Sequence, residues 1–219
     1  MLAPVGQQDV WAIAYNNDCY SERTKVSYTV NPIPDAPAVE NKEVCFGEES
    51  IFVTAEGETG SLLTWYADAN KKQKLPSSAE GYKPTVDQVD VYTYYVTQKV
   101  NGCESSVAEV QYEVKPLPFA PEIVQSPSKL CEYSEHPELI VSGENIKWYN
   151  DADKTEFVSS GDSYTIDDMS VGTHKYYATQ TVRECEGSPK LISYSTFFCN
   201  FILNIKYIYN LLIINIKES

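Results

Sequence analysis

The chain has 219 residues with 31 acidic and 17 basic side chains, so its formal net charge is −14. This acidity excludes a nucleic-acid partner, which needs a basic stripe, and argues against contact with an anionic membrane, which attracts Lys and Arg. Tyrosine occurs 17 times and mostly falls in alternating runs of the β type.

The sequence repeats itself, and the repeat indicates the domain organisation. Residues 19–37 read CYSERTKVSYTVNPIPDAP and align without a gap with residues 103–121, CESSVAEVQYEVKPLPFAP. A third copy of the motif follows Cys185, where Ile192 and Tyr194 take the same offsets. Such a period predicts an array of small modules, an architecture that usually spaces or binds and rarely catalyses.

The first 35 residues match only the later part of the next unit, because WAIAYNNDCYSER corresponds to YVTQKVNGCESS. We therefore expect residues 1–35 to form a partial module that holds only the C-terminal strands. Since this module begins in mid-repeat, we also expect that Met1 is not the natural start of the protein.

Residues 36–118 form the first complete unit. β-type runs predict strands at 50–55, 62–66, 91–99 and 107–114. Asn101-Gly102, between the last two, is a strong signal for a two-residue hairpin turn. Short alternating strands separated by turn residues predict an antiparallel β-sandwich.

Residues 119–196 repeat this plan, so the predicted fold is all-β with tandem antiparallel sandwiches. The Trp-Tyr pair at 148–149 corresponds to the pair at 65–66, and YYATQ corresponds to YYVTQ. The tryptophans could be sugar-stacking platforms, but their place on the predicted central strand favours core packing. The predicted core aromatics are Trp65, Trp148, Tyr94 and Tyr176.

The motifs VCFGEESIFVTAEG, LTWYADA and YTYYVTQKVNGCESS, with a P-x-P-x-A-P linker, resemble the immunoglobulin-like repeats of large secreted and surface proteins of Bacteroidota. Those proteins include gliding-associated adhesins and are often exported through a C-terminal sorting domain. The resemblance covers residues 5–196 and implies an extracellular or cell-surface location. It implies neighbouring Ig-like repeats of a longer chain as partners, with an extracellular protein or glycan as a further ligand.

Two kinds of segment lie outside the modules. The linkers VNPIPDAP and VKPLPFAP are rich in proline, which favours an extended backbone, so we expect successive modules to stand in a fairly stiff line.

Residues 197–219 lack the repeat and consist mainly of residue types that codons of A and T alone encode, which suggests a frame change or read-through. A membrane anchor is the rival interpretation, because 197–216 is about the length of a span. Lys206 and four asparagines make that insertion costly. A natural amphipathic ending is the third interpretation.

Cysteines at repeat-locked positions in an acidic β-rich chain indicate disulfides and an oxidising compartment. The chain has no C-x-x-C pair and two histidines, so no zinc site is expected. One pairing joins Cys45 to Cys103 and Cys131 to Cys185 within units.

A second pairing joins Cys45 to Cys185 between units and leaves Cys19, Cys103 and Cys131 to partners in other repeats. In an immunoglobulin-type sandwich the strands beside Cys45 and Cys103 run the same way, which separates these cysteines by about 20 Å. A disulfide tolerates only about 7 Å between Cα atoms. Both pairings are open at this point.

No catalytic or cofactor motif occurs: the sequence lacks a G-x-S-x-G elbow, a phosphate loop, H-E-x-x-H and an EF-hand loop. Asp151 and Asp153 are too few to hold calcium, and a turn in which Asp bonds its own backbone is preferred. We expect no enzyme activity and no cofactor. Exposed loops differ between the units while strand aromatics agree, which favours a structural spacer of an adhesin-like protein over a carbohydrate- or ligand-binding module.

Overall fold

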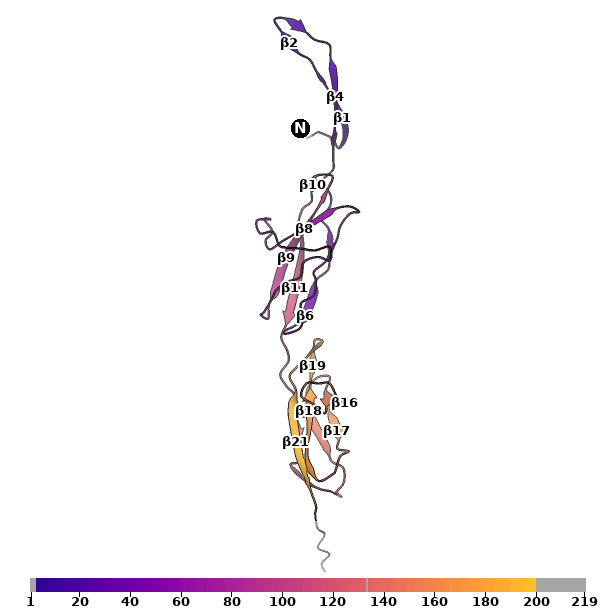
Figure 1. Ribbon diagram of the computed structural model, residues 1–219, viewed down its shortest axis with the longest axis vertical. Helices are drawn as coiled ribbons and strands as arrows, with labels where there is room; N and C mark the ends of the chain where they lie inside the picture. Colours follow the sequence, from indigo (N-terminus) through magenta and orange to yellow (C-terminus); the bar gives the residue numbers. More distant parts are fainter. Residues whose placement is uncertain (1–2, 133, 200–219) are drawn as a thin grey trace, which may run out of the picture. The chain divides into compact units, whose positions relative to one another are not determined.

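The structure is a computed structural model that describes residues 3–132 and 134–199 (Figure 1). All regular elements of this part of the chain are β-strands. The described residues include no helix that is long and apolar enough to cross a membrane. Contacts divide the chain into two units, Met1–Pro116 and Leu117–Ser219.

Unit 1 begins with a two-stranded ribbon (Figure 1). β1 (Gly6–Ala12) pairs antiparallel with β4 (Thr24–Val30). The short strands β2 (Tyr15–Asn16) and β3 (Cys19–Tyr20) pair with each other nearer the turn. Within the described residues no further strand pairs with β1 or β4, so the ribbon is a sheet of two strands.

The rest of unit 1 is a β-sandwich. Its main sheet has the order β10–β9–β11–β6, and β8 also pairs with β9, while β5 and β7 form a small second sheet. The strands are β5 (Ala38–Val39), β6 (Lys42–Cys45), β7 (Ala55–Glu56), β8 (Leu62–Tyr66), β9 (Val91–Val100), β10 (Cys103–Glu104) and β11 (Ala108–Lys115).

Three of the four strands predicted for this module are confirmed within a residue at each end, as β8, β9 and β11. The prediction at 50–55 is wrong, because this run forms only a bridge at Val53 before the short β7 begins. The Val53 backbone exchanges hydrogen bonds of 2.8 and 3.1 Å with Tyr82, which lies in a loop. The alternation of apolar and polar residues therefore predicted that Val53 points inward, but it did not predict that Val53 bonds to Tyr82.

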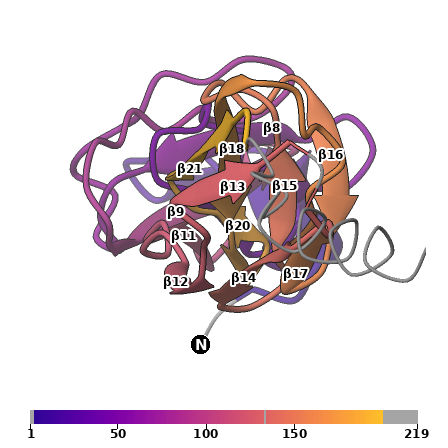
Figure 2. The same cartoon turned by 90° about the horizontal axis from the view of Figure 1, so that it is seen from below.

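Unit 2 is a second sandwich of a five-stranded sheet, β13–β21–β18–β15–β16, and a three-stranded sheet, β12–β14–β17. Figure 2 shows β14 and β17 on one side and β13, β15 and β18 on the other. The strands are β12 (Glu122–Gln125), β13 (Lys129–Cys131), β14 (Glu138–Ser142), β15 (Lys147–Tyr149), β16 (Phe157–Ser160), β17 (Ser163–Thr165), β18 (Gly172–Thr179), β19 (Thr181–Val182), β20 (Cys185–Glu186) and β21 (Lys190–Phe197).

Each sandwich contains one parallel pair among its antiparallel strands. β6 pairs parallel with β11, so Cys45 lies opposite Lys115. In the same way β13 pairs parallel with β21, and Cys131 lies opposite Phe197. The first cysteine of each module is therefore at the end of the module where its last strand finishes.

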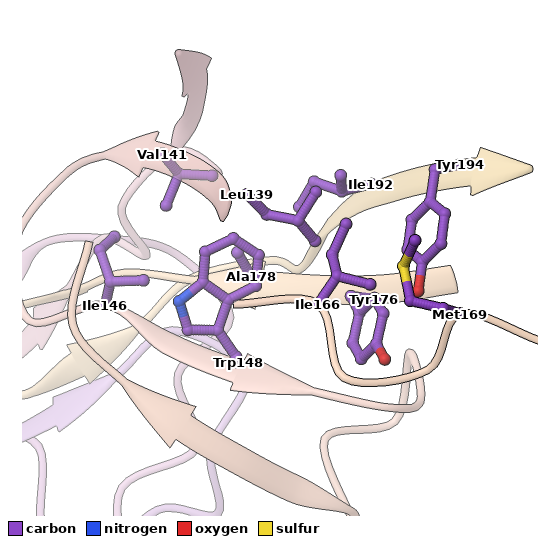
Figure 3. Packing of buried hydrophobic residues seen from close by; sticks show 10 residues of the cluster. All are labelled: Leu139, Val141, Ile146, Trp148, Ile166, Met169, Tyr176, Ala178, Ile192 and Tyr194. Atoms are coloured by element: carbon purple, nitrogen blue, oxygen red, sulfur yellow. The ribbon is translucent and has the colours of Figure 1, made fainter. Parts of the chain in front are cut away.

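One buried cluster fills each sandwich. In unit 2 the cluster joins residues from both sheets around Trp148 (Figure 3). The Trp148 ring is fully buried, and its Nε1–H donates a hydrogen bond of 2.8 Å to the Gly161 carbonyl. Tyr176 lies in this cluster, and Trp65 and Tyr94 lie in the cluster of unit 1. All four aromatics predicted for the core are thus buried.

We predict that Trp148→Ala lowers the free energy of unfolding of unit 2 by about 3–5 kcal/mol, because it removes a large buried ring and leaves a cavity. Urea unfolding monitored by circular dichroism measures the change. The control is Leu191→Ala in β21, since Leu191 is exposed. A loss below about 1 kcal/mol for Trp148→Ala would contradict the central role of this ring.

Candidate functional site: the linker-binding end of each module

Three motifs that recur in the sequence meet at one end of each module. A Thr-Gln pair lies near the end of β9 in unit 1 and at the end of β18 in unit 2, where Thr179 is the last strand residue. A Cys-Glu pair follows the hairpin turn, and a Trp-Tyr pair ends β8 or β15. In unit 1 the hairpin turns at Asn101 and Gly102, with φ of 49° and 86°. Glycine adopts this left-handed backbone without steric cost, so Asn-Gly is a favoured hairpin turn.

The Glu of the Cys-Glu pair accepts hydrogen bonds from the other two motifs. In unit 1, Glu104 Oε1 accepts from Thr97 Oγ1 at 3.0 Å and from Tyr66 OH at 3.4 Å. Lys71 Nζ lies 3.2 Å from the same oxygen. The hydrogen bond from Thr97, followed by that from Lys71, lowers the pKa of Glu104.

Unit 2 contains the same network with shorter hydrogen bonds. Glu186 Oε1 accepts from Thr179 Oγ1 at 2.7 Å and from Tyr149 OH at 2.9 Å. Burial opposes ionisation of Glu186, but these hydrogen bonds and nearby Lys154 and Lys147 outweigh it and lower its pKa. Burial, followed by the Glu186 carboxylate, raises the pKa of Tyr149 to about 12. The network joins the hairpin to β15, the strand that carries Trp148.

The Gln of the Thr-Gln pair binds the proline-rich linker. In unit 1, Gln98 Nε2 donates a hydrogen bond of 2.8 Å to the carbonyl of Asp35 in the VNPIPDAP linker. Gln98 Oε1 accepts one of 2.7 Å from the Glu58 backbone N–H. Gln98 is buried, so both polar ends of its amide need these partners.

Unit 2 repeats this arrangement at the equivalent positions. Gln180 Nε2 donates 2.7 Å to the carbonyl of Phe119 in the VKPLPFAP linker, and its Oε1 accepts 3.0 Å from the Glu144 N–H. Phe119 follows Asp35 by one repeat, so both modules hold the same linker position. We call Gln98 and Gln180 the linker clamp of their modules.

A glycine makes room for each linker clamp. A Cβ on Gly57 would lie 2.9 Å from Gln98 Oε1, and one on Gly143 would lie 2.7 Å from Gln180 Oε1. Each glycine directly precedes the Glu whose N–H binds the clamp. The glycine therefore leaves room for the Gln amide beside the backbone.

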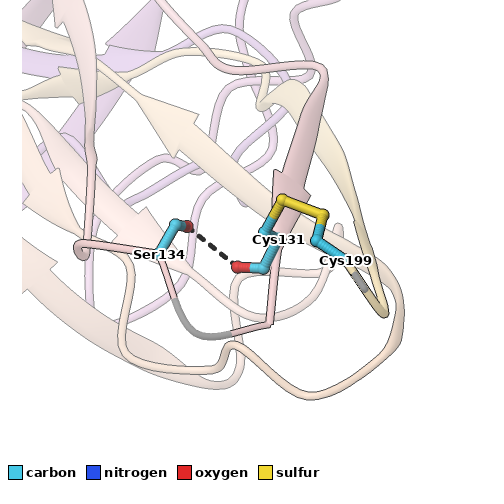
Figure 4. The surroundings of a disulfide bond; sticks show 3 residues. All are labelled: Cys131, Ser134 and Cys199. Carbon is cyan, nitrogen blue, oxygen red and sulfur yellow. Dashed lines mark hydrogen bonds between the residues drawn. A yellow bond between two sulfur atoms is a disulfide. The ribbon is translucent and has the colours of Figure 1, made fainter. Parts of the chain in front are cut away.

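The structure corrects the predicted pairing of cysteines within units. Cys131 forms a disulfide with Cys199, with a Cα–Cα distance of 5.2 Å, and the Ser134 hydroxyl donates 2.8 Å to the Cys131 carbonyl (Figure 4). The predicted Cys131–Cys185 bond is therefore wrong, because Cys131 bonds Cys199 instead. Cys103 has a free thiol, as has the exposed Cys19, so the Cys45–Cys103 bond is also absent.

The physical reason is the parallel pair of each module. Cys45 lies opposite the last residue of β11, whereas Cys103 precedes the first, so a strand of eight residues, about 25 Å, separates them. The same geometry separates Cys131 from Cys185. Cys199 follows Phe197 at the Cys131 end of β21, which is why it is within reach. The Cys45–Cys185 pairing stays a prediction, and residues 200–219 of the tail lie outside the described residues.

The predicted turn at Asp151 is confirmed. Its carboxylate accepts hydrogen bonds of 3.0 and 2.6 Å from the backbone N–H groups of Thr155 and Glu156. Asp68 does the same in unit 1, where the hydrogen bond from Gln73 lowers its pKa most. Among residues 3–132 and 134–199, no group of three or more His, Cys, Asp or Glu could hold a metal ion.

Sequence reasoning missed the linker clamp and the Glu network. The signal was present, since Thr-Gln, Cys-Glu and Gly-Glu recur in both complete units. Their recurrence was visible, but their hydrogen-bond partners lie 7 to 63 positions away in the sequence. Spacing alone could not connect them.

Two stacked sheets that enclose a buried Trp define an immunoglobulin-like β-sandwich. Residues 34–116 match the model of the family described as "Ig-like domain CHU_C associated". The first complete module is therefore an immunoglobulin-like domain of the Bacteroidota type, and the resemblance inferred from the sequence is confirmed for these residues. No curated protein matches the chain.

Solved structures of tandem domains show a low similarity. The FN1–FN3 domains of chicken CNTN1 are 14% identical with a TM-score of 0.42, over 89% of this chain and 77% of that chain. Extracellular domains 3–5 of Drosophila OTK are 11% identical with a TM-score of 0.33, over 90% and 72%. The titin domains z1z2, in complex with telethonin, are 15% identical with a TM-score of 0.32, over 77% and 98%.

We predict that unit 2 loses stability as pH falls below 4.5, the ordinary pKa of Glu186. Its pKa is lowered in the folded state, so the carboxylate stabilises folding above that value and loses this contribution on protonation. Glu186→Gln should flatten this acid dependence, measured as urea midpoints across the pH range. The control is Glu122→Gln on β12, an exposed carboxylate; equal acid slopes for both variants would refute the role of Glu186.

We also predict that Gln180→Ala speeds cleavage by chymotrypsin after Phe119. The side chain of Phe119 is exposed, and Gln180 holds its carbonyl. One hydrogen bond contributes about 0.5–1.5 kcal/mol, so its loss should raise the rate of cleavage by a factor of about 2 to 10. Gln98→Ala is the matched control, because it frees Asp35 instead. Unchanged cleavage in Gln180→Ala would show that the clamp does not restrain the linker.

Proposed function

We propose that the chain is a non-catalytic structural spacer of an extracellular surface or adhesin-like protein built of immunoglobulin-like repeats. The observation that carries this proposal is the linker clamp. In both modules the recurring Gln binds the same carbonyl of the preceding linker, at 2.8 and 2.7 Å. A module that recurs with the same hydrogen bond to its preceding linker is suited to building arrays of defined geometry.

The burial of the aromatic residues supports the spacer over a carbohydrate-binding module. Trp65 and Trp148 are 1% and 0% exposed, so neither ring is a platform for a sugar. Their family of Ig-like domains is typically structural and non-catalytic. The partners that we propose are neighbouring Ig-like repeats, with a protein or glycan ligand placed elsewhere in the protein.

The disulfide supports the proposed location. Cys131 and Cys199 are bonded in unit 2, and structural disulfides persist in secreted proteins and at cell surfaces but are rare in the reducing cytosol. We therefore place the protein outside the cell or on its surface.

A bond between Cys45 and Cys185 would stiffen the spacer, and the repeat supports it. In unit 1, Cys103 Sγ lies 3.9 Å from the carbonyl of Asn31. Asn31 corresponds to Lys115 one repeat later, and Lys115 pairs with Cys45 in the sheet. Cys185 takes the position of Cys103 in the next repeat, so the same contact would bring it close to Cys45.

We predict that Cys45→Ser exposes a reactive thiol at Cys185 and increases bending between the modules. Thiol labelling with peptide mapping identifies the cysteine, and small-angle X-ray scattering should report a smaller radius of gyration. Cys19→Ser is the control, since Cys19 is an exposed free thiol. Labelling of Cys185 in the unmodified protein would refute the bond, and identical scattering would argue against a stiffening role.

A further inference from the structure

The N-terminal ribbon has the register of the long strand pair in the next module. β1 and β4 pair over the same positions as β9 and β11, one repeat earlier. The ribbon pairs Val10–Val26, Gln8–Tyr28 and Ala12–Thr24 correspond to Tyr94–Val110, Tyr92–Tyr112 and Val96–Ala108. The ribbon therefore presents the face that forms a sandwich core in the next module.

In the ribbon this face is exposed. Val26 and Tyr28 are 47% and 43% exposed, whereas Val110 and Tyr112 are both 0% exposed. Burying such side chains stabilises a fold, because their apolar surface is removed from water. The face carries side chains of the core type, but among the described residues no second layer of strands buries them.

The next module shows which strands these are. There, Val44, Val53 and Trp65 join Val110 and Tyr112 in one buried cluster. β6 pairs parallel with the free edge of β11, and β8 pairs antiparallel with the free edge of β9. All of these covering residues come from the first half of the module.

We propose that the exposed face of the ribbon, formed by Val10, Val26 and Tyr28, is a docking surface for the first half of an immunoglobulin-like module. The occupant is a polypeptide segment with the pattern of residues 36–89. It adds one strand parallel to β4 and another antiparallel to β1, and it places the Trp of its Trp-Tyr pair opposite Ala12, as Trp65 lies opposite Val96 in the next module. This inference does not depend on the spacer role, which would stand if it failed.

The edges of the ribbon favour this occupant over a second copy of the chain. Among the described residues no strand pairs with the outer edge of β1 or of β4. A first-half segment would pair with both edges while covering the apolar face. Two ribbons packed face to face would cover the face but would leave every outer edge open. The register that β1 and β4 share with β9 and β11, which extends from Gln7 to Ala12, further specifies this partner.

The test grafts residues 36–89 in front of Gly6 of the full chain, replacing residues 1–5. The junction keeps the natural spacing, because Gly6 corresponds to Asp90 one repeat later. We expect amide hydrogen exchange in β1 and β4 to slow by about tenfold or more relative to the parent chain, because a packed core protects its strands. Exchange is measured by mass spectrometry on peptides from the ribbon.

Two variants of the grafted chain serve as a matched pair. Tyr28→Asp places a charge on the docking face and should abolish the protection. Thr29→Asp places the same charge on the opposite face, since neighbouring strand residues point to opposite sides, and should retain it. Equal protection in both variants would overturn the proposal.

A disulfide gives an independent readout. The grafted copy of Cys45 should lie opposite Asn31, which corresponds to Lys115, and Cys103 Sγ is already 3.9 Å from the Asn31 carbonyl. With oxidised glutathione, the two thiols should lose two protons and two electrons to form a disulfide, while one glutathione disulfide is reduced to two thiols. Peptide mapping then finds Cys103 bonded to the grafted cysteine.

Two results would overturn the proposal. The first is a grafted chain whose ribbon exchanges as fast as in the parent and whose Cys103 stays reduced. The second is concentration-dependent protection of the ribbon in the unmodified chain with a dimer in sedimentation, since a second copy would then be the occupant.

Discussion

The long antiparallel pair of strands that closes each module, β9–β11 in unit 1 and β18–β21 in unit 2, is the constraint on which the structure depends. Its inward residues, such as Val110 and Ile192, supply the core. The ends of the pair position the Thr-Gln and Cys-Glu motifs, which join the hairpin to the strand that carries the buried Trp and hold the linker. The same pair of strands therefore supports both the core and the attachment of the linker.

The N-terminal ribbon shows what this pair is without the rest of a module. Its backbone ladder is complete between β1 and β4, but Val26 and Tyr28 remain exposed. Pairing satisfies the backbone of two strands locally, whereas burial needs a second layer. The comparison separates the contribution of hydrogen bonding from that of core packing within one sequence.

Sequence reasoning succeeded where the signal was local and failed where a distant partner decided the structure. β8 and β9 follow directly from their β-branched and aromatic runs. The run at 50–55 has a similar pattern, yet its central residue bonds to Tyr82 in a loop. Gln98 shows the same limit, because its amide joins a linker carbonyl 63 positions away to a loop N–H 40 positions away.

The sequence by itself determined a tandem array of β-sandwiches, because the repeat and the alternation of inward residues are properties of the chain read in order. It also placed Trp65 and Trp148 in the cores. Only the tertiary structure decided which cysteine Cys131 bonds and which carbonyl each clamp holds. These pairings depend on the parallel register of β13 with β21 and on the path of the linker across the hairpin. Such contacts join residues far apart in the chain, and their distances exist only once the sheets have formed.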